Sequence, residues 1–243
     1  MRLVKWEKLP ENMQNEQVKK YYDALRKKRF SLFCKRVFDI FVSAFMLLLV
    51  SPLFIILALA IKIDSKGPVF FRQVRVTQYG KEFRIFKFRT MVNNADKIGS
   101  QVTVGNDQRI TKVGRLIRKC RLDEICQLID VFRGTMTFVG TRPEVPKYVD
   151  KYTDEMRASL LLPAGVTSLA SIKYKDEDKL LNDADNVDEV YVNEVLPEKM
   201  KYNLSEIEKF GFWRDIKIMF MTVFAVFKKE KSQDTQVENV DGK

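Results

Sequence analysis

The segment Ile40–Ile61, IFVSAFMLLLVSPLFIILALAI, decides how the chain can fold, because it contains 22 consecutive residues without a charge. As a single α-helix it would be about 33 Å long, enough to cross a hydrocarbon core of roughly 30 Å. Its midpoint, Ser51-Pro52, argues against a plain transmembrane span, because proline removes a helical hydrogen bond and clashes with the carbonyl of Leu48. A kinked span is the alternative, with the serine hydroxyl bonding a freed carbonyl.

Basic residues stand on both sides of this apolar segment. Those before it are Arg26, Lys27, Lys28, Arg29, Lys35 and Arg36, and those after it are Lys62, Lys66, Arg72 and Arg75. A spanning helix usually has its basic flank on one side only. We therefore predict a re-entrant membrane helix over residues 35–63, which enters, bends at Ser51-Pro52 and returns to the same face. Asp39, at the edge of the segment, is expected to pair with Lys35 or Arg36.

The composition limits the chemistry that the chain can perform. The 243 residues carry a net charge of +11, which suits nucleic acid or an anionic membrane surface, and the position of the charges beside the apolar segment favours the membrane. The three cysteines have no framework spacing and are expected to be reduced thiols in a cytosolic compartment. Because the chain has no histidine, acid–base or nucleophilic chemistry must use carboxylates, lysines or hydroxyls.

The fold class expected is α+β and mainly helical, with a small β-hairpin, the re-entrant helix and interfacial amphipathic helices. Residues 1–34 are expected to form an amphipathic leader that packs on the membrane surface or on the domain. Residues 69–77 and 83–91 are rich in aromatic and β-branched residues and predict the hairpin, with a bulge between Ile85 and Phe86. A cytoplasmic catalytic domain over residues 64–227 is predicted, followed by a disordered tail over residues 228–243.

Several further elements are expected along the catalytic domain. Helices are predicted near residues 112–120, 122–134, 145–162 and 188–210, with Gly134 as a C-terminal cap. Residues 138–144 and 163–172 are expected to be irregular, and residues 92–106 to be a loop or a short helix. The acidic segment 174–189 is expected to be a solvated turn. Residues 212–227 have the pattern of an interfacial amphipathic helix.

Two adjacent acids, Asp123 and Glu124, are the candidate catalytic residues. The simple alternative is that they complement the dipole of the helix that they begin. With basic residues just before them, they also suit a phosphate and Mg²⁺ site. Lys87 and Arg89 alternate with Phe86 and Phe88 on a predicted strand, which indicates either an ordinary solvated face or a basic face for phosphate.

Several segments in order make the chain resemble the bacterial sugar transferases that are monotopic phosphoglycosyl transferases. These segments are KRVFD (35–39), Ser51-Pro52, DSKGPVFFRQVR (64–75), FRIFKFRTM (83–91), NDQRITKVGRLIRK (106–119), LDEICQL (122–128), VFRGTMTFVGTRPE (131–144) and WRDIKIMFMTV (213–223). The family transfers a sugar 1-phosphate from a UDP-sugar to polyprenyl (undecaprenyl) phosphate and releases UMP. It initiates the assembly of capsule, exopolysaccharide, lipopolysaccharide or other glycans.

The resemblance implies roles for individual residues. Asp123 would be the nucleophile that forms a phospho-aspartyl intermediate, and Glu124, with Asp123, would hold Mg²⁺. The resemblance implies that Arg118 and Arg142 contact phosphate. We predict that Lys87, Arg89, Arg109 and Pro143 bind substrate as well. The resemblance also implies a re-entrant helix broken at Ser51 and Pro52. It places the protein at the cytoplasmic face of the bacterial inner membrane, among membrane lipids and possible downstream glycosyltransferases.

The chain departs from the family pattern at Thr141, Ser168 and Ser171, where proline, glycine and glutamine are usual. Two other functions remain open. A basic membrane-anchored scaffold without chemistry would use the acidic pair only as a helix cap. A nucleic-acid binder would explain the net charge, but the chain has no recognisable binding motif and this function leaves the apolar segment unexplained. We expect no nucleic-acid partner.

Overall fold

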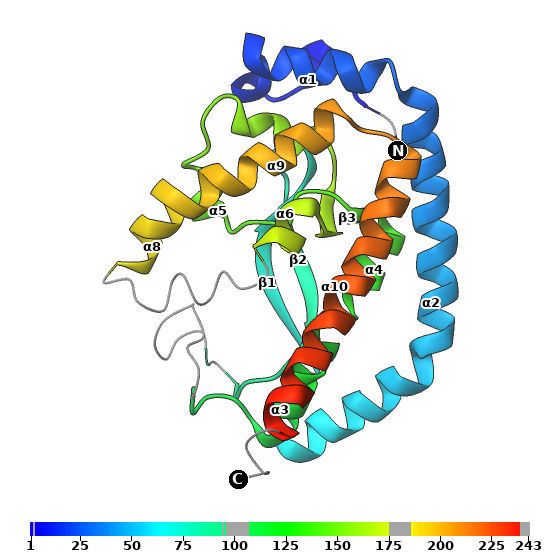
Figure 1. Ribbon diagram of the computed structural model, residues 1–243, viewed down its shortest axis with the longest axis vertical. Helices are drawn as coiled ribbons and strands as arrows, with labels where there is room; N and C mark the ends of the chain where they lie inside the picture. The colour runs from blue at the N-terminus through cyan, green and yellow to red at the C-terminus, as the bar shows by residue number, and fades with distance from the viewer. Residues whose placement is uncertain (2, 94, 96–106, 175–185, 239–243) are drawn as a thin grey trace.

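The computed structural model describes residues 1, 3–93, 95, 107–174 and 186–238. Its longest element is the helix α2 (Arg29–Asp64), which runs along one side of the molecule and bends inward toward its C-terminal end (Figure 1). Pro52 lies inside α2, and the hydroxyl of Ser51 donates to the carbonyl oxygen of Leu48 at 2.8 Å. The bond from Ser51 is the one considered for a kinked span, and α2 is continuous through Pro52. The helix begins at Arg29, six residues earlier than expected.

The predicted hairpin is present, but without a bulge. Strands β1 (Phe70–Val76) and β2 (Glu82–Phe88) are antiparallel, joined through the 3₁₀ turn η3 (Gln78–Gly80), and pair without interruption from Phe70–Phe88 to Val76–Glu82. Ile85 packs in a cluster with α4 and β3, whereas Phe88 on the opposite face packs against α2. Both faces of the hairpin are covered, so consecutive apolar residues need no bulge.

A second, parallel strand pair follows, in segments that we expected to be irregular. The structure has a 3₁₀ turn η5 (Leu122–Glu124), helix α4 (Gln127–Arg133), strand β3 (Met136–Val139) and strand β4 (Ala164–Thr167) beside β3. A Cβ on Gly165 would lie 2.2 Å from the backbone nitrogen of Gly140, so this pairing requires a glycine. The other helical elements of this part are α3 (Lys112–Lys119), α5 (Pro146–Val149), η6 (Met156–Leu161) and α6 (Leu169–Lys173).

Three predictions for this part are corrected and one is confirmed. Residues 145–162 form α5 and η6 rather than one helix, because the chain turns between Asp150 and Glu155. The predicted helix over 122–134 is divided, since the regular helix begins only at Gln127. The predicted loop over 163–172 contains β4 and α6, and Ser168 caps α6 by accepting from the amide of Ser171. Gly134 ends α4 with φ +86°, as predicted for a C-terminal cap.

The N-terminal segment packs on the domain. It contains the 3₁₀ turns η1 (Trp6–Lys8) and η2 (Glu11–Met13) and the helix α1 (Glu16–Arg26), whose buried face includes Val18, Tyr22 and Leu25. These side chains share one core with η6 and with the helix formed by α8 (Val187–Val190), the π-turn η7 (Tyr191–Val195) and α9 (Leu196–Glu208). That long helix matches the one predicted near residues 188–210.

The C-terminal helix α10 (Phe212–Glu238) runs beside α2 (Figure 1). It remains helical to Glu238, past the predicted start of the tail at Lys228. Lys35 donates to Asp215 of α10 at 2.5 Å, whereas Asp39 accepts from the hydroxyl of Thr137 at 2.7 Å. Asp39 therefore pairs with β3 and not with Lys35 or Arg36, because its side chain faces the domain.

The remaining predictions concern cysteines and two acidic or polar segments. All three cysteines are free thiols, as expected. The predicted loop or short helix over 92–106 and the predicted turn over 174–189 fall largely on residues outside the described ranges.

Candidate active site

Asp123 and Glu124 lie on η5, directly after a strained residue. Arg121 has φ +53°, a left-handed conformation that is uncommon for a residue with a side chain, and it follows the end of α3 where glycine is the usual choice. The acids precede α4 by several residues, and α4 has no side-chain cap. The two acids therefore begin the short turn η5 and not the regular helix α4, whose first residue is Gln127.

Glu124 is held by two cations from distant parts of the chain. Its Oε1 accepts from Lys87 Nζ at 2.8 Å, and the same oxygen forms a close ion pair with Arg142. Burial opposes ionisation of this carboxyl, but the charges and hydrogen bonds of Arg142 and Lys87 outweigh it and hold the pKa of Glu124 well below its usual range. Glu124 is consequently a carboxylate at any physiological pH.

Asp123 has the opposite electrostatic environment. Burial, and then the negative charge of Glu124, raise the pKa of Asp123 above its ordinary value, while Lys87 and Arg118 partly oppose the shift. None of the described residues forms a side-chain hydrogen bond or ion pair with its carboxylate. The two adjacent acids thus differ in their environment. The charge of Glu124 is neutralised by two cations, whereas the Asp123 carboxylate has no such partner in the described part of the chain and is more basic than usual.

Arg118 reaches the site from α3. Its Nε donates to the hydroxyl of Thr90 at 2.8 Å, just after β2. This close approach depends on Gly114, at which a Cβ would lie 2.0 Å from the carbonyl oxygen of Thr90. The helix therefore packs directly on the backbone that follows β2, and Arg118 is close enough to Asp123 to influence its pKa.

Two of the basic residues predicted to bind substrate have other roles. Arg89 is 5% exposed and its guanidinium donates to the carbonyls of Ser65 at 2.7 Å and Lys66 at 3.1 Å, so it caps the C-terminal end of α2. Arg109 forms an ion pair with its neighbour Asp107 and donates to the carbonyl of Ala95. The guanidinium of each thus holds backbone or a neighbouring side chain, and their assignment as substrate ligands stays a prediction.

Arg75 belongs near the site and was not predicted. Its Nη1 donates to the carbonyl of Pro143 at 3.1 Å, and burial lowers its pKa. The pairing of the hairpin could have indicated Arg75. Phe71 pairs with Lys87, and Arg75 lies four residues after Phe71, so Arg75 and Lys87 lie on the same face of the two strands. In the sequence, that alternation was considered only for Lys87 and Arg89, on one predicted strand.

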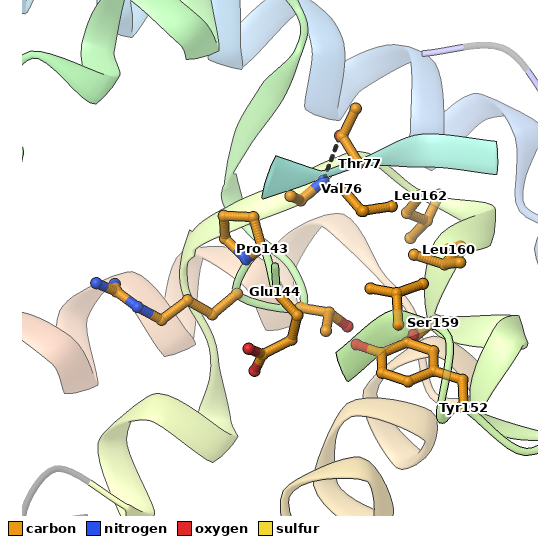
Figure 2. A pocket seen from close by; sticks show the side chains of 12 residues that line it. Val76, Thr77, Pro143, Glu144, Tyr152, Ser159, Leu160 and Leu162 are labelled. Carbon is orange, nitrogen blue, oxygen red and sulfur yellow. Dashed lines mark hydrogen bonds between the residues drawn. The ribbon is translucent and has the colours of Figure 1, made fainter. Parts of the chain in front are cut away.

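Pro143 and Arg142 both line a small cavity, which is shown in Figure 2. The cavity measures about 10 Å³, room for a single water molecule at most. Glu144, Tyr152 and Ser159 also line it, and Ser159 lies beside Tyr152 (Figure 2). Residues 140–142 are bonded to β4 on one side, through Gly140 N to Thr167 O at 3.0 Å and Gly165 N to Thr141 O at 2.8 Å. The segment that carries Arg142 is therefore bound along its length.

A site of this kind suits reactions of phosphate esters. Cations from the hairpin, from α3 and from the 140–144 segment surround an acidic pair, and Arg142, Lys87 and Arg118 could neutralise phosphate oxygens. An ionised Glu124 and an adjacent Asp123 present hard oxygen atoms, as Mg²⁺ prefers. Of the predicted residues, the structure brings together Asp123, Glu124, Lys87, Arg118, Arg142 and Pro143.

Known proteins similar to this chain are named as enzymes that transfer phosphate-linked sugars. A family model described as bacterial sugar transferase matches residues 30–229. The UDP-glucose:undecaprenyl-phosphate glucose-1-phosphate transferase of Klebsiella pneumoniae is 38% identical over 79% of this chain and 40% of its own length. The undecaprenyl-phosphate galactose phosphotransferase of Salmonella typhimurium is 33% identical over 84% of this chain and 42% of its own length.

A shorter relative, the UDP-glucose:undecaprenyl-phosphate glucose-1-phosphate transferase of Caulobacter vibrioides, is 34% identical over 78% of this chain and 68% of its own length. The chain thus spans about two fifths of the Klebsiella and Salmonella proteins and about two thirds of the Caulobacter protein. Since the family model covers most of this sequence, including the acidic pair and the cations around it, the chain belongs to the bacterial sugar transferase family.

Proposed function

We propose that this protein transfers a sugar 1-phosphate from a UDP-sugar to undecaprenyl phosphate and releases UMP, the first membrane step of a bacterial glycan. The relatives' names provide the substrate classes. The single observation that supports the proposal most directly is that the two acids of the pair have different electrostatic environments. Glu124 is neutralised by Lys87 and Arg142, and Asp123 beside it remains available with a raised pKa.

In the proposed reaction, a carboxylate oxygen of Asp123 attacks the sugar-bearing phosphorus of the UDP-sugar. A bond forms between this oxygen and phosphorus, the bond to the bridging oxygen breaks, and UMP leaves with that oxygen. An oxygen of undecaprenyl phosphate then attacks the same phosphorus and releases the Asp123 carboxylate. Arg142, Lys87 and Arg118 would neutralise phosphate oxygens, because a carboxylate approaching a diphosphate otherwise meets repulsion from every side.

The donor set fits Mg²⁺. Lys87 and Arg142 both contact Oε1 of Glu124, which leaves Oε2 and the Asp123 carboxylate as hard oxygen donors. The described residues hold no cluster of three or more ligating side chains, so water and the diphosphate would complete the coordination, as is usual for Mg²⁺. When bound, the ion would offset charge on the diphosphate.

We further propose that α2 is a re-entrant helix and that the protein lies on the cytoplasmic face of the inner membrane. Support comes from where the ends of α2 are attached. Near its beginning, Lys35 bonds to Val139 and Asp215, and at its end, Asp64 accepts from the amide of Val113. A helix with both ends bound to one folded body does not place them on opposite sides of a bilayer.

Exposed apolar side chains on both halves of α2 support contact with lipid. They are Phe30, Phe33, Phe41, Phe45, Leu48, Leu49, Ile55, Ile56, Leu59 and Ile63. Only 11% of its most apolar window is buried inside the molecule, which is unlike a core helix. A shallow helix would keep the site at the headgroup plane, where the phosphate of the lipid acceptor lies.

The decisive experiment measures UMP release by purified protein with Mg²⁺, undecaprenyl phosphate and a panel of UDP-sugars. Asp123→Asn should abolish turnover, because an amide is a far poorer phosphate acceptor than a carboxylate. Asp154→Asn, an exposed position away from the site, is the matched control and should leave turnover unchanged. With a radiolabelled β-phosphate and no lipid, the wild type should retain label on Asp123.

Two results would contradict the proposal. Asp123→Asn with near-normal turnover would remove Asp123 as nucleophile. Absence of UMP release with every UDP-sugar would favour the membrane-anchored scaffold instead.

A further inference from the structure

Glu144 follows Arg142 and Pro143 directly and carries a buried polar network that the proposed reaction does not use. Its Oε1 accepts from the hydroxyl of Tyr191 at 2.5 Å. Lys199 Nζ donates to the same hydroxyl at 3.0 Å and lies 3.6 Å from Oε1 of Glu144. Tyr191 is 5% exposed and Lys199 is 8% exposed, so a charged pair and a hydroxyl are removed from water together.

The helix that supplies Tyr191 and Lys199 has an irregularity between them. Tyr191 begins the π-turn η7, and Lys199 lies on α9 beyond it. In an unbroken α-helix, residues eight positions apart point about 80° away from each other around the axis. A π-turn accommodates one extra residue and would reduce this angle to about 20°. The π-turn therefore turns both side chains toward Glu144.

Burying such a network costs free energy, because charges lose their hydration and the hydrogen bonds only partly compensate. A role beyond stability would account for it. Its position indicates what it provides. The carbonyl of Glu144 accepts from the amide of Val76 at 2.9 Å, and the carbonyl of Pro143 accepts from Arg75. Together with the bonds of residues 140 and 141 to β4, these contacts secure both sides of Arg142.

We propose that Tyr191 and Lys199 are positioning residues, which hold Glu144 so that the preceding Arg142 is kept on Glu124 in the geometry needed for transfer. This inference rests on the proposed function. The network acts through the backbone of residues 142–144: it fixes the side chain of Glu144 at one end, and the guanidinium of Arg142 is held at the other. Tyr191 and Lys199 touch neither acid of the catalytic pair.

The test is a double-mutant cycle between Tyr191→Phe and Arg142→Lys. Tyr191→Phe keeps the ring, which packs at 4.6 Å from the ring of Tyr148, and removes only the hydroxyl. The turnover number for UMP release should fall about 10- to 100-fold, as expected for a small misplacement of a group that stabilises the transition state. In the Arg142→Lys background, the same change should have less than about a twofold effect, because its target is already lost.

Tyr148→Phe is the matched control. It removes the hydroxyl of the neighbouring ring in the same aromatic pair, whose partner is the exposed Asp188 at 2.6 Å, and should leave turnover unchanged. Lys199→Met, which removes the second donor to the network, should act in the same direction as Tyr191→Phe.

Hydrogen exchange provides a readout that is independent of turnover. The amides of Val76 and Gly165, which donate to the carbonyls of Glu144 and Thr141, should exchange faster in Tyr191→Phe and not in Tyr148→Phe.

The outcomes are separable. Suppose that the wild type releases UMP. The positioning role alone is then overturned if Tyr191→Phe leaves turnover unchanged or changes only KM. It is also overturned if Tyr191→Phe lowers turnover by the same factor with Arg142 and with Arg142→Lys. A wild type that releases no UMP overturns the proposed function and this role with it.

Discussion

At the scale of single residues, neighbours in the sequence have unrelated functions in the structure. Lys87 and Arg89 are two positions apart on one basic stretch, yet Lys87 neutralises Glu124 and Arg89 caps α2. Asp123 and Glu124 are adjacent, yet their pKa values shift in opposite directions. In each case the difference arises from what the surrounding elements place against the side chain.

The raised pKa of Asp123 predicts the pH dependence of catalysis. The proposed attack requires the Asp123 carboxylate, so kcat/KM should fall as the pH drops through the pKa of Asp123. This pKa lies above that of an ordinary aspartate because of burial and of Glu124. Lys87 lowers this pKa, so Lys87→Met should move the acid limb of the profile to higher pH. Lys81→Met, at an exposed position of the hairpin turn, should leave the limb in place. An unmoved limb in Lys87→Met would contradict the assignment.

The same shift affects stability, with the sign set by linkage. Because the folded pKa of Asp123 is raised, its contribution to stability is fully present below the unfolded pKa and is lost as the pH rises through the folded pKa. At neutral pH, Asp123→Asn should therefore unfold at a higher temperature than the wild type in detergent, despite being inactive. At acidic pH the difference in unfolding temperature between Asp123→Asn and the wild type should shrink. A larger difference at acidic pH than at neutral pH would contradict a raised pKa.

Arg89 and Lys87 offer a second contrast, between stability and catalysis. Arg89→Met would leave the carbonyls of Ser65 and Lys66 without their buried donor, a loss of about 2–3 kcal/mol for hydrogen bonds to a charged group. We expect its thermal midpoint to fall by several degrees. Lys87→Met breaks a partly exposed ion pair, worth about 1 kcal/mol or less, and should reduce turnover instead. Equal stability of the two variants would refute the capping role.

At the scale of elements, α10 has two different faces. Ile218 is buried against the domain and Thr222 bonds to Thr167, while Trp213, Phe220 and Phe224 are 79%, 62% and 71% exposed. This division agrees with the amphipathic pattern predicted from residue 212 to 227 and is typical of a helix at a lipid interface.

Brominated lipids provide the test of α10. With Trp6 replaced by Phe, the fluorescence of Trp213 should be strongly quenched by lipids brominated near the headgroup. The converse variant, Trp213→Phe, keeps only Trp6, which packs against Tyr22 in the core and should be quenched weakly. If both variants responded equally, α10 would not be the element in contact with lipid.

At the scale of the whole molecule, the N-terminal segment and the catalytic domain form one body. The amide of Val4 donates to the hydroxyl of Tyr79 at the hairpin turn, 75 positions away, and α1 shares its core with α9. These contacts join chain from before α2 to chain from after it. Both parts are consequently expected on the same side of the membrane.

Cysteine labelling in cells would test this topology. In a variant without Cys34, Cys120 and Cys126, single cysteines at the exposed positions Lys8 and Lys81 should both resist an impermeant maleimide in spheroplasts. Both should react in inside-out vesicles. Labelling of only one position from the periplasmic side would exclude a re-entrant α2. Pro52→Ala should increase periplasmic labelling at position 8, because it restores the missing helical hydrogen bond and favours a straight helix.

Local patterns in the sequence were sufficient for a large part of the fold. The long apolar helix with Pro52 inside it, the two arms of the hairpin and the cap at Gly134 were all predicted correctly. Each depends on residues only a few positions apart, so short-range sterics and hydrogen bonds determine it. Asp123 and Glu124 were proposed as the catalytic pair from their basic neighbours and from the resemblance to a family motif, and that role stays a prediction.

Contacts between distant segments were decided only by the tertiary structure. The parallel pair of β3 and β4 joins residues nearly thirty positions apart, Asp39 bonds to Thr137 rather than to its helical neighbours, and Tyr191 reaches Glu144 across 47 positions. The sequence supplied the amphipathic pattern of each element, but a charged side chain acquires its partner and its pKa only where packing removes water around it. Burial, which is a property of the assembled molecule, therefore determined which of the basic residues lie against Glu124 and which hold backbone carbonyls.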